Sequence, residues 1–237
     1  MLRVGILAAG GGTNLQAIID AVESRKITDV ELCFVLSNKP GVRALERART
    51  HGIKPIVVDM KSYADRAEFE KMLIETIDAE APELIVLAGM MIMMPVELVR
   101  KYHNRIINVH PALIPSFCGK GFYGIRPHEA VLKSGVKVTG ATVHFVDEVY
   151  DHGAIIMQKA VYVKNGDTPE ELQHRVPQGL FAGPEGRTEG GDEADRHTGG
   201  VGRVQRREVG EAAGAVYEAG AGKAVSYTHL RAHETEA

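Results

Sequence analysis

The apolar residues of this chain fall into short runs separated by mixed, partly charged stretches. Seven runs have the length of a β-strand: residues 4–8, 31–36, 55–58, 84–88, 105–109, 138–146 and 154–163. The run at 84–88 is apolar at every position, as strands at the centre of a parallel sheet tend to be. The chain therefore predicts a buried sheet.

Between most of these runs, apolar residues recur at the spacing of a helix. Helices are expected at residues 15–22, 42–51, 65–81 and 128–134, after Pro95, and from about Asp167 onward. Strands that alternate with helices predict an α/β fold, with a doubly wound and mostly parallel sheet.

A glycine run joins the first predicted strand to the first helix. Gly10, Gly11 and Gly12 come directly before Thr13 and Asn14. Such a turn directs free backbone N–H groups at a ligand, and the missing side chains allow a close approach. We predict that the turn binds an anion, with Thr13 or Asn14 capping the helix or contacting a phosphate oxygen. A tight turn without a ligand is the alternative. The run lacks the third spaced glycine of the dinucleotide-binding pattern.

Two polar residues stand at the end of the run at 105–109. Asn108 and His110 are two positions apart, so both side chains emerge on one face of the strand, which Pro111 ends. The carboxyl edge of a parallel sheet is where ligands bind. Asn can stabilise a developing oxyanion, and His can transfer a proton. We predict a catalytic site here, next to a long functional loop at residues 111–127. Polar residues that only cap neighbouring loops are the alternative.

Composition narrows the class of protein. The chain has 237 residues, 44% of them hydrophobic, and a formal charge of −3, which gives no electrostatic case for nucleic acid as a partner. No apolar run approaches the roughly 20 residues of a membrane helix. The first residues read as a strand and not as a signal peptide. Cys33 and Cys118 are isolated, so we expect a reduced, cytoplasmic protein without a metal site.

The composition changes after Val176. Residues 177–237 contain 12 Gly, one Lys, and no Ile or Met, whereas residues 1–176 contain 16 Ile and 8 Met. Too few apolar residues remain there to build a core. We expect either a disordered tail or a segment translated out of frame, and we favour the second because residues 226–235 resemble a translated sequencing adapter.

Five segments together resemble the phosphoribosylglycinamide formyltransferases, folate-dependent enzymes of purine synthesis. Their order and spacing match the family over residues 1–176, and the segments are residues 10–18, 86–91, 107–115, 140–146 and 151–153. The resemblance implies a Rossmann-like formyltransferase domain at 1–176. It also implies transfer of a formyl group from 10-formyltetrahydrofolate to the amine of glycinamide ribonucleotide, without a metal, in a monomer or homodimer.

The resemblance also implies roles for individual residues. Asn108, His110 and Asp151 match the catalytic residues of the family, and Gly12, Thr13 and Asn14 match its contacts to the ribonucleotide phosphate. The folate contacts match Arg66, Met91, Ile92, Met93, Met94 and Asn108. Asp151 next to His110 is expected to raise the pKa of the imidazole and to fix its tautomer. Asp151 can also be a turn residue only.

The chain departs from the family pattern in two places. After Leu-Ala-Gly the family commonly has an aromatic residue followed by Met-Arg or Met-Lys, whereas this chain has Met at 90, 91, 93 and 94 and Ile92. The family also continues past Val176 into a helix with a Glu that contacts the ribonucleotide, and Pro177 onward does not reproduce it. Substrate binding and stability would both suffer from that loss.

Other functions stay open. Methionyl-tRNA formyltransferase shares the Asn-x-His core but lacks the glycine turn and has an added RNA-binding domain. Formyltetrahydrofolate hydrolase has an additional N-terminal domain, whereas this chain begins at its first strand. A non-catalytic nucleotide-binding module would use only the turn at residues 10–14, and would leave Asn108, His110 and Asp151 without a task.

Overall fold

The computed structural model describes residues 1–181 of the chain, and the side chains of residues 1–176. The strands are β1 (Leu2–Leu7), β2 (Val30–Ser37), β3 (Lys54–Val57), β4 (Leu84–Leu87), β5 (Ile106–His110), β6 (Val138–Phe145) and β7 (Ile155–Tyr162). The helices are α1 (Thr13–Glu23), α2 (Arg43–Thr50), the 3-10 helix η1 (Met60–Ser62), α3 (Arg66–Glu80), α4 (Val96–Lys101), α5 (Arg126–Ser134) and α6 (Pro169–Phe181). Residues 182–237, most of the predicted tail, lie outside the described part of the chain.

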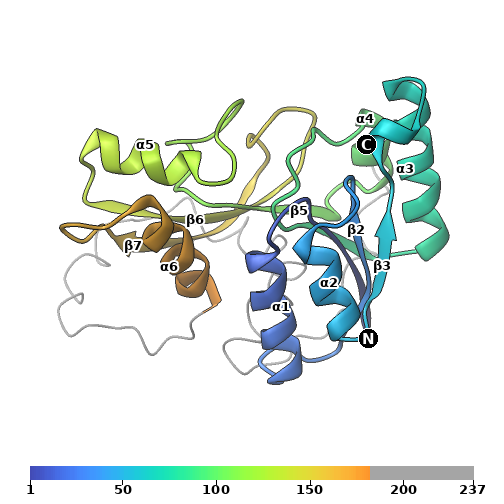
Figure 1. The fold of residues 1–237 in the computed structure, drawn as a ribbon, viewed down its shortest axis with the longest axis horizontal. Coiled ribbons are helices and arrows are strands. Elements are labelled where there is room, and N and C mark those ends of the chain that lie inside the picture. The colour runs from blue at the N-terminus through green and yellow to red at the C-terminus, as the bar shows by residue number, and fades with distance from the viewer. Residues whose placement is uncertain (182–237) are drawn as a thin grey trace, which may run out of the picture.

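The strands form one seven-stranded sheet in the order β3-β2-β1-β4-β5-β6-β7. Strands β1 to β5 pair in parallel, and β6 and β7 are antiparallel to their neighbours. The chain winds from β1 outward to β3 and then crosses to β4 on the other side of β1 (Figure 1). The prediction of a doubly wound, mostly parallel α/β sheet is confirmed. Ligands bind such sheets at the carboxyl ends of the strands beside the reversal.

Helices cover both faces of the sheet. On one face Leu15 of α1, Leu45 of α2 and Val176 of α6 belong to one buried cluster. On the other face Phe69 of α3 and Leu98 of α4 belong to a second cluster. Burial of apolar area at roughly 25 cal/mol per Å² on both faces holds the strands in a fixed plane. The carboxyl ends of the strands are thereby held in place.

Side-chain caps fix where two helices begin. The Asp65 side chain accepts a hydrogen bond from the Glu68 N–H at the start of α3. At α6, Thr168 Oγ1 accepts from the Glu171 N–H, and the Glu171 carboxylate accepts from the Thr168 N–H. This reciprocal capping box satisfies two N–H groups that the helix cannot use. Both helix starts were predicted from these residues.

Most of the predicted elements are offset from the observed ones by one or two residues, and the differences that follow concern the helices. Helix α5 begins at Arg126, two residues before His128, and Pro95 is the N-cap of α4 and not part of its first turn. Helix α6 continues to Phe181, beyond Val176. The 3-10 helix η1 was not predicted, because three residues are too few to show a period.

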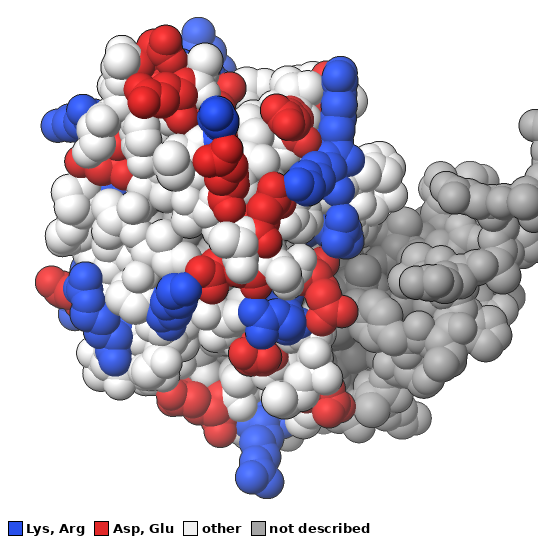
Figure 2. Space-filling model, turned by 90° about the vertical axis from the view of Figure 1, so that its right-hand side faces the viewer, with Lys and Arg blue, Asp and Glu red and all other residues white. Residues whose placement is uncertain are grey.

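Charged side chains of both signs are interspersed on the face that carries α3 (Figure 2). Several are paired, including Lys54 with Glu80 and Lys101 with Asp78. This face therefore has no extended patch of a single sign. None of the described helices is long and apolar enough to cross a membrane.

Candidate active site

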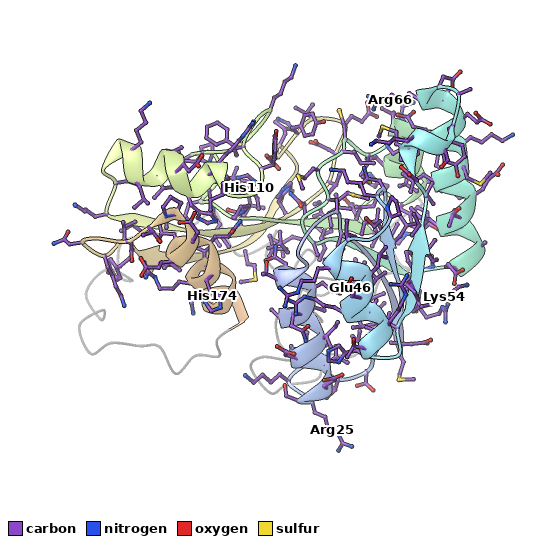
Figure 3. All side chains as sticks on the ribbon, viewed as in Figure 1. Arg25, Glu46, Lys54, Arg66, His110 and His174 are labelled. Atoms are coloured by element: carbon purple, nitrogen blue, oxygen red, sulfur yellow. The ribbon has the colours of Figure 1, made fainter. Side chains whose placement is uncertain are left out.

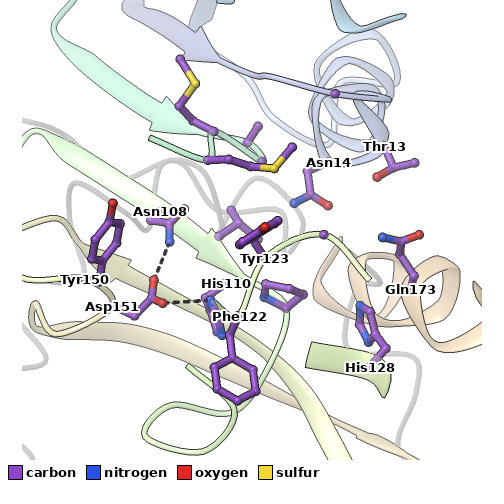
Figure 4. A pocket seen from close by; sticks show the side chains of 18 of the residues that line it. Thr13, Asn14, Asn108, His110, Phe122, Tyr123, His128, Tyr150, Asp151 and Gln173 are labelled. Carbon is purple, nitrogen blue, oxygen red and sulfur yellow. Dashed lines mark hydrogen bonds and ion pairs between the residues drawn. The ribbon is translucent and has the colours of Figure 1, made fainter. Parts of the chain in front are cut away.

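A pocket of about 330 Å³ opens at the carboxyl ends of β1, β4 and β5 (Figure 4). The glycine turn after β1 and residues 88–91 after β4 line one side. Residues 108–111 and residues 119–124 line the other, together with side chains from α5, α6 and the turn before β7. The pocket lies where the order of the strands reverses, as the topology predicts.

The glycine turn is fastened to α2 by its carbonyl groups. The Gly10 carbonyl accepts from the Ala44 N–H at 3.1 Å, and the Gly11 carbonyl accepts from Arg47 Nε at 3.0 Å. Gly12 has a φ of 70°, and a Cβ there would lie 2.9 Å from the Ala44 Cα. Only glycine fits this position, because a side chain would be strained and would clash with backbone. With its carbonyls held by α2, the turn is left with its N–H groups for a ligand.

The first turn of α1 faces the same pocket. Gly12 is its N-cap, and no side chain caps the helix. The first N–H groups of a helix have no partner within it, and they carry the positive end of the helix dipole. Thr13 and Asn14 line the pocket, and neither caps the helix. Of their two predicted roles, capping is wrong, and contact with an anion stays a prediction.

Asn108 lies on β5 and uses both protons of its amide. Its Nδ2 lies 3.1 Å from His144 Nε2 and donates to Asp151 Oδ1 at 3.3 Å. Since Nδ2 can only donate, His144 accepts at Nε2 and carries its own proton at Nδ1, which lies 2.8 Å from the Phe145 carbonyl. These contacts fix the orientation of the Asn108 amide.

His110 is 3% exposed and has a neighbour at each ring nitrogen. Its Nε2 lies 2.9 Å from the Phe117 carbonyl, which can only accept, so Nε2 carries a proton. Its Nδ1 lies 3.5 Å from Asp151 Oδ2. Nδ1 is therefore the atom that gains or loses a proton, and Asp151 faces it.

Asp151 is both a turn residue and a member of the cluster. Its φ is 51°, a left-handed conformation that Asp tolerates better than most residues. Two residues later, Gly153 approaches the Phe145 carbonyl so closely that a Cβ would lie 1.9 Å from it. Asp151 Oδ2 accepts from the Gly119 N–H at 2.8 Å. This turn aims the carboxylate at β5, so the structure brings Asn108, His110 and Asp151 together.

Burial determines the charge of the His110 imidazole. Burial lowers the pKa of His110 below the ordinary value, and the Asp151 charge and the Phe117 carbonyl, which both raise this pKa, do not overcome the effect of burial. The prediction that Asp151 raises this pKa above its ordinary value is wrong in net direction. Burial disfavours the Asp151 carboxylate too, but its pKa lies below the usual value, because the Gly119 N–H donates to it at 2.8 Å and His110, once protonated, places a positive charge beside it. At neutral pH the pair is a neutral imidazole beside a carboxylate.

The predicted folate contacts divide between two hollows. Met91 and Asn108 line the main pocket. Arg66, Met93 and Met94 line a second hollow of about 480 Å³ between α3 and α4. Ile92 lines neither and packs against the core on the α3 face.

Arg66 stands apart from Asn108, His110 and Asp151. Its side chain is 68% exposed and pairs with Glu70 at 2.5 Å. In Figure 3 it lies at the start of α3, well separated from His110. Any ligand that contacts both residues must be long.

Several pocket residues were not predicted from the sequence. They are Lys120 and Tyr123 in the loop at residues 111–125, His128 on α5, Tyr150 in the turn, and Gln173 on α6. The length of the loop was a signal for its role, whereas a single polar residue on a helix gives none. Among the residues described, no three His, Cys, Asp or Glu side chains are grouped to hold a metal ion.

The sequence pattern of the formyl transferase family matches residues 2–179. The chain belongs to the formyl transferase family. The resemblance read from the sequence is thereby confirmed, and the family match, like α6, extends a few residues past Val176.

Among members of the formyl transferase family, the chain is 43% identical over 177 residues to the trifunctional purine biosynthetic protein adenosine-3 of Gallus gallus. This match covers 75% of the chain and 17% of the relative. It is 38% identical over 176 residues to the chloroplastic phosphoribosylglycinamide formyltransferase of Arabidopsis thaliana, with 73% of the chain and 60% of the relative covered. The chain thus spans less than two thirds of the length of either relative.

A solved structure gives the same fold. The glycinamide ribonucleotide transformylase 1 of Symbiobacterium toebii matches with a TM-score of 0.69 and 39% identity. The match covers 75% of this chain and 81% of that one. The α/β architecture of the formyl transferase family therefore holds for this chain over most of the length of the solved structure.

Proposed function

We propose that this chain transfers a formyl group from 10-formyltetrahydrofolate to the amine of glycinamide ribonucleotide, a step of purine synthesis. One observation supports the proposal: a single pocket has the uncapped N-terminus of α1 at one end and Asn108, His110 and Asp151 at the other. Glycinamide ribonucleotide has a phosphate at one end and an amine at the other, so the separation of these two parts of the pocket suits it. The names of the relatives agree with this reaction.

The phosphate is proposed to bind at Gly12, Thr13 and Asn14. Two carbonyls of the glycine turn are held by α2, so its N–H groups and those of the first α1 turn can point at the anion. Charge attraction and backbone hydrogen bonds then fix this end of the substrate. The other end, with the amine, is directed toward β5.

Asn108 is proposed to stabilise the negative oxygen that forms when the amine attacks the formyl carbon. Both of its N–H groups already have acceptors, at 3.1 Å and 3.3 Å. The longer bond, to Asp151, is the one that the oxyanion can replace, because the shorter bond to His144 keeps the amide in place. A donor held in this way is worth roughly 3–4 kcal/mol of transition-state stabilisation.

His110 is proposed to accept the proton that the attacking amine loses. Its low pKa leaves Nδ1 unprotonated at neutral pH, and Asp151 Oδ2 at 3.5 Å stabilises the imidazolium once it forms. The protonated ring adds positive charge beside the oxyanion. When the bond between the formyl carbon and the folate nitrogen breaks, the proton passes to that nitrogen, directly or through an ordered water.

The folate is proposed to extend from Asn108 along Met91–Met94 to Arg66. The two hollows border this segment, and methionine side chains adapt to flat ligands. The proposed activity needs no metal. We further propose that the protein acts in the cytoplasm on small molecules and not on nucleic acid, as a monomer or homodimer.

The test is the dependence of turnover on the ribonucleotide. The full chain, given 10-formyltetrahydrofolate with an added chelator, should release tetrahydrofolate only when glycinamide ribonucleotide is present. Release of formate without the ribonucleotide would identify a hydrolase instead. Loss of turnover on chelation would contradict a reaction without a metal.

A further inference from the structure

A network of hydrogen-bonded polar side chains connects α1 to α2 next to the glycine turn. The two helices cover the same face of the sheet and lie side by side (Figure 1). Gln16 of α1, Arg47 of α2 and His51, the C-cap of α2, form this outer network. None of these three side chains lines the pocket, so any effect that they have on a substrate must be indirect.

Arg47 is the member of the outer network that touches the glycine turn. Its Nε donates to the Gly11 carbonyl at 3.0 Å, and its Nη1 donates to Gln16 Oε1 at 2.5 Å. The guanidinium is a rigid plane, so acceptors at two of its nitrogens fix both its position and its orientation. Without Gln16 the long arginine side chain would sample several rotamers and would hold the Gly11 carbonyl only part of the time.

The Gln16 amide is itself held by three neighbours. Its Oε1 faces the guanidinium of Arg47, which can only donate. Its Nε2 donates to Asp20 Oδ1 at 2.8 Å and lies 3.2 Å from His51 Nε2. Because an amide nitrogen only donates, His51 accepts at Nε2 and carries its proton at Nδ1, which lies 2.6 Å from Glu23 Oε1. Each donor in the outer network thus faces an acceptor, from Glu23 to Arg47.

We propose that Gln16 and His51 are positioning residues for the substrate anion and that they act through Arg47. This inference rests on the proposed function, because it takes the N–H groups of the glycine turn as the phosphate site. Arg47 holds the Gly11 carbonyl on the α2 side, which leaves the N–H groups of the turn for the pocket. Gln16 and His51 keep the guanidinium in place. Loss of either side chain should therefore weaken binding of the ribonucleotide and not of the folate.

The experiment measures both Michaelis constants in the wild type, Gln16→Met, His51→Leu and His51→Gln. Gln16→Met should raise the KM for the ribonucleotide about 5-fold, the scale of one hydrogen bond, with kcat and the KM for the folate nearly unchanged. His51→Leu leaves Gln16 its bond to Asp20 and should raise the same KM only about 2- to 3-fold. His51→Gln keeps an acceptor for the Gln16 amide and should restore most of that loss.

The double variant Gln16→Met/Arg47→Met tests whether Gln16 acts through Arg47. If it does, the KM for the ribonucleotide in the double variant should equal that of Arg47→Met alone, because the guanidinium that Gln16 holds is already gone. Increases that multiply in the double variant would show that Gln16 acts independently, and they would overturn the proposal.

Controls separate positioning from folding and from the proposed reaction. The exposed His103→Leu should behave as the wild type. Urea unfolding identifies a variant that fails to fold, and the His51 variants then decide the question. Equal increases in both Michaelis constants, or wild-type values in both Gln16→Met and His51→Leu, would overturn this inference alone. A wild type that does not formylate glycinamide ribonucleotide would overturn the proposed function and this inference with it.

Discussion

The glycine turn makes a prediction that separates folding from substrate binding. At Gly12 a Cβ would lie 2.9 Å from the Ala44 Cα and 3.2 Å from the Arg47 Cδ, with φ at 70°. Gly12→Ala should therefore cost about 1–2 kcal/mol for the left-handed backbone and about 1–3 kcal/mol for overpacking against α2. A total of about 2–5 kcal/mol is a large part of the 5–15 kcal/mol that typically stabilises a domain.

Gly11→Ala is the matched control one residue away. A Cβ at Gly11 meets no atom within 4 Å, and the residue lines the pocket mouth. We expect a change in stability below about 0.5 kcal/mol, together with a raised KM for the ribonucleotide and an unchanged KM for the folate. The added methyl group lies where the anion should approach.

Urea unfolding followed by far-ultraviolet circular dichroism measures the difference, since the chain has no Trp to report by fluorescence. With a slope of about 2 kcal/mol per M, Gly12→Ala should lower the midpoint by roughly 1–2.5 M, and Gly11→Ala should leave it nearly unchanged. Equal midpoints for the two variants would refute the claim that α2 fastens the turn. Equal increases in both Michaelis constants for Gly11→Ala would refute its role in phosphate binding.

Three further predictions concern side chains around the pocket. Arg47→Met removes the donor to the Gly11 carbonyl, so the KM for the ribonucleotide should rise several-fold in steady-state kinetics while the KM for the folate stays unchanged. Equal increases in both KM values would contradict the role of Arg47 in holding the glycine turn. Between pH 6.5 and 4 the unfolded chain binds a proton at His128 that the folded chain does not, so the free energy of unfolding should fall by about 3 kcal/mol as the pH drops through this window. Urea unfolding at several pH values measures this dependence, and His128→Leu should reduce it. A variant with the same pH dependence as the wild type would contradict the buried neutral ring. Asp151→Asn removes the negative charge that partly offsets the effect of burial on His110, so the pKa of His110 should fall further in an NMR titration. The rate of formyl transfer should drop roughly 10²-fold. An unchanged pKa would leave Asp151 as a turn residue only.

The fold and the candidate catalytic residues on β5 could be predicted because their signals are local. The strand runs and helix caps each depend on a few neighbouring residues, and Asn108 and His110 disturb an otherwise apolar strand end. The glycine turn is likewise continuous in sequence. The location of the pocket follows from the point where the order of the strands reverses, at the carboxyl ends of the parallel strands.

The contacts of these residues depend on distant parts of the chain. His144 lies within an apolar run and reads as an ordinary strand residue, yet the antiparallel pairing of β5 with β6 places it opposite Asn108. The pKa of His110 was predicted with the wrong sign because its neighbour Asp151 is visible in the family pattern, whereas its burial is not. His128 and Gln173 lie on separate helices, and only their packing brings them to one pocket.

The most direct test of the account follows the formyl carbon itself. The full chain is mixed with glycinamide ribonucleotide and 10-formyltetrahydrofolate labelled with ¹³C in the formyl group, and the label is followed by NMR. The account predicts that the label moves into a formamide on the ribonucleotide amine, at a rate that Asn108→Ala or His110→Asn lowers by roughly 10²-fold or more. A label that appears as free formate, or a transfer rate that both substitutions leave unchanged, would contradict it.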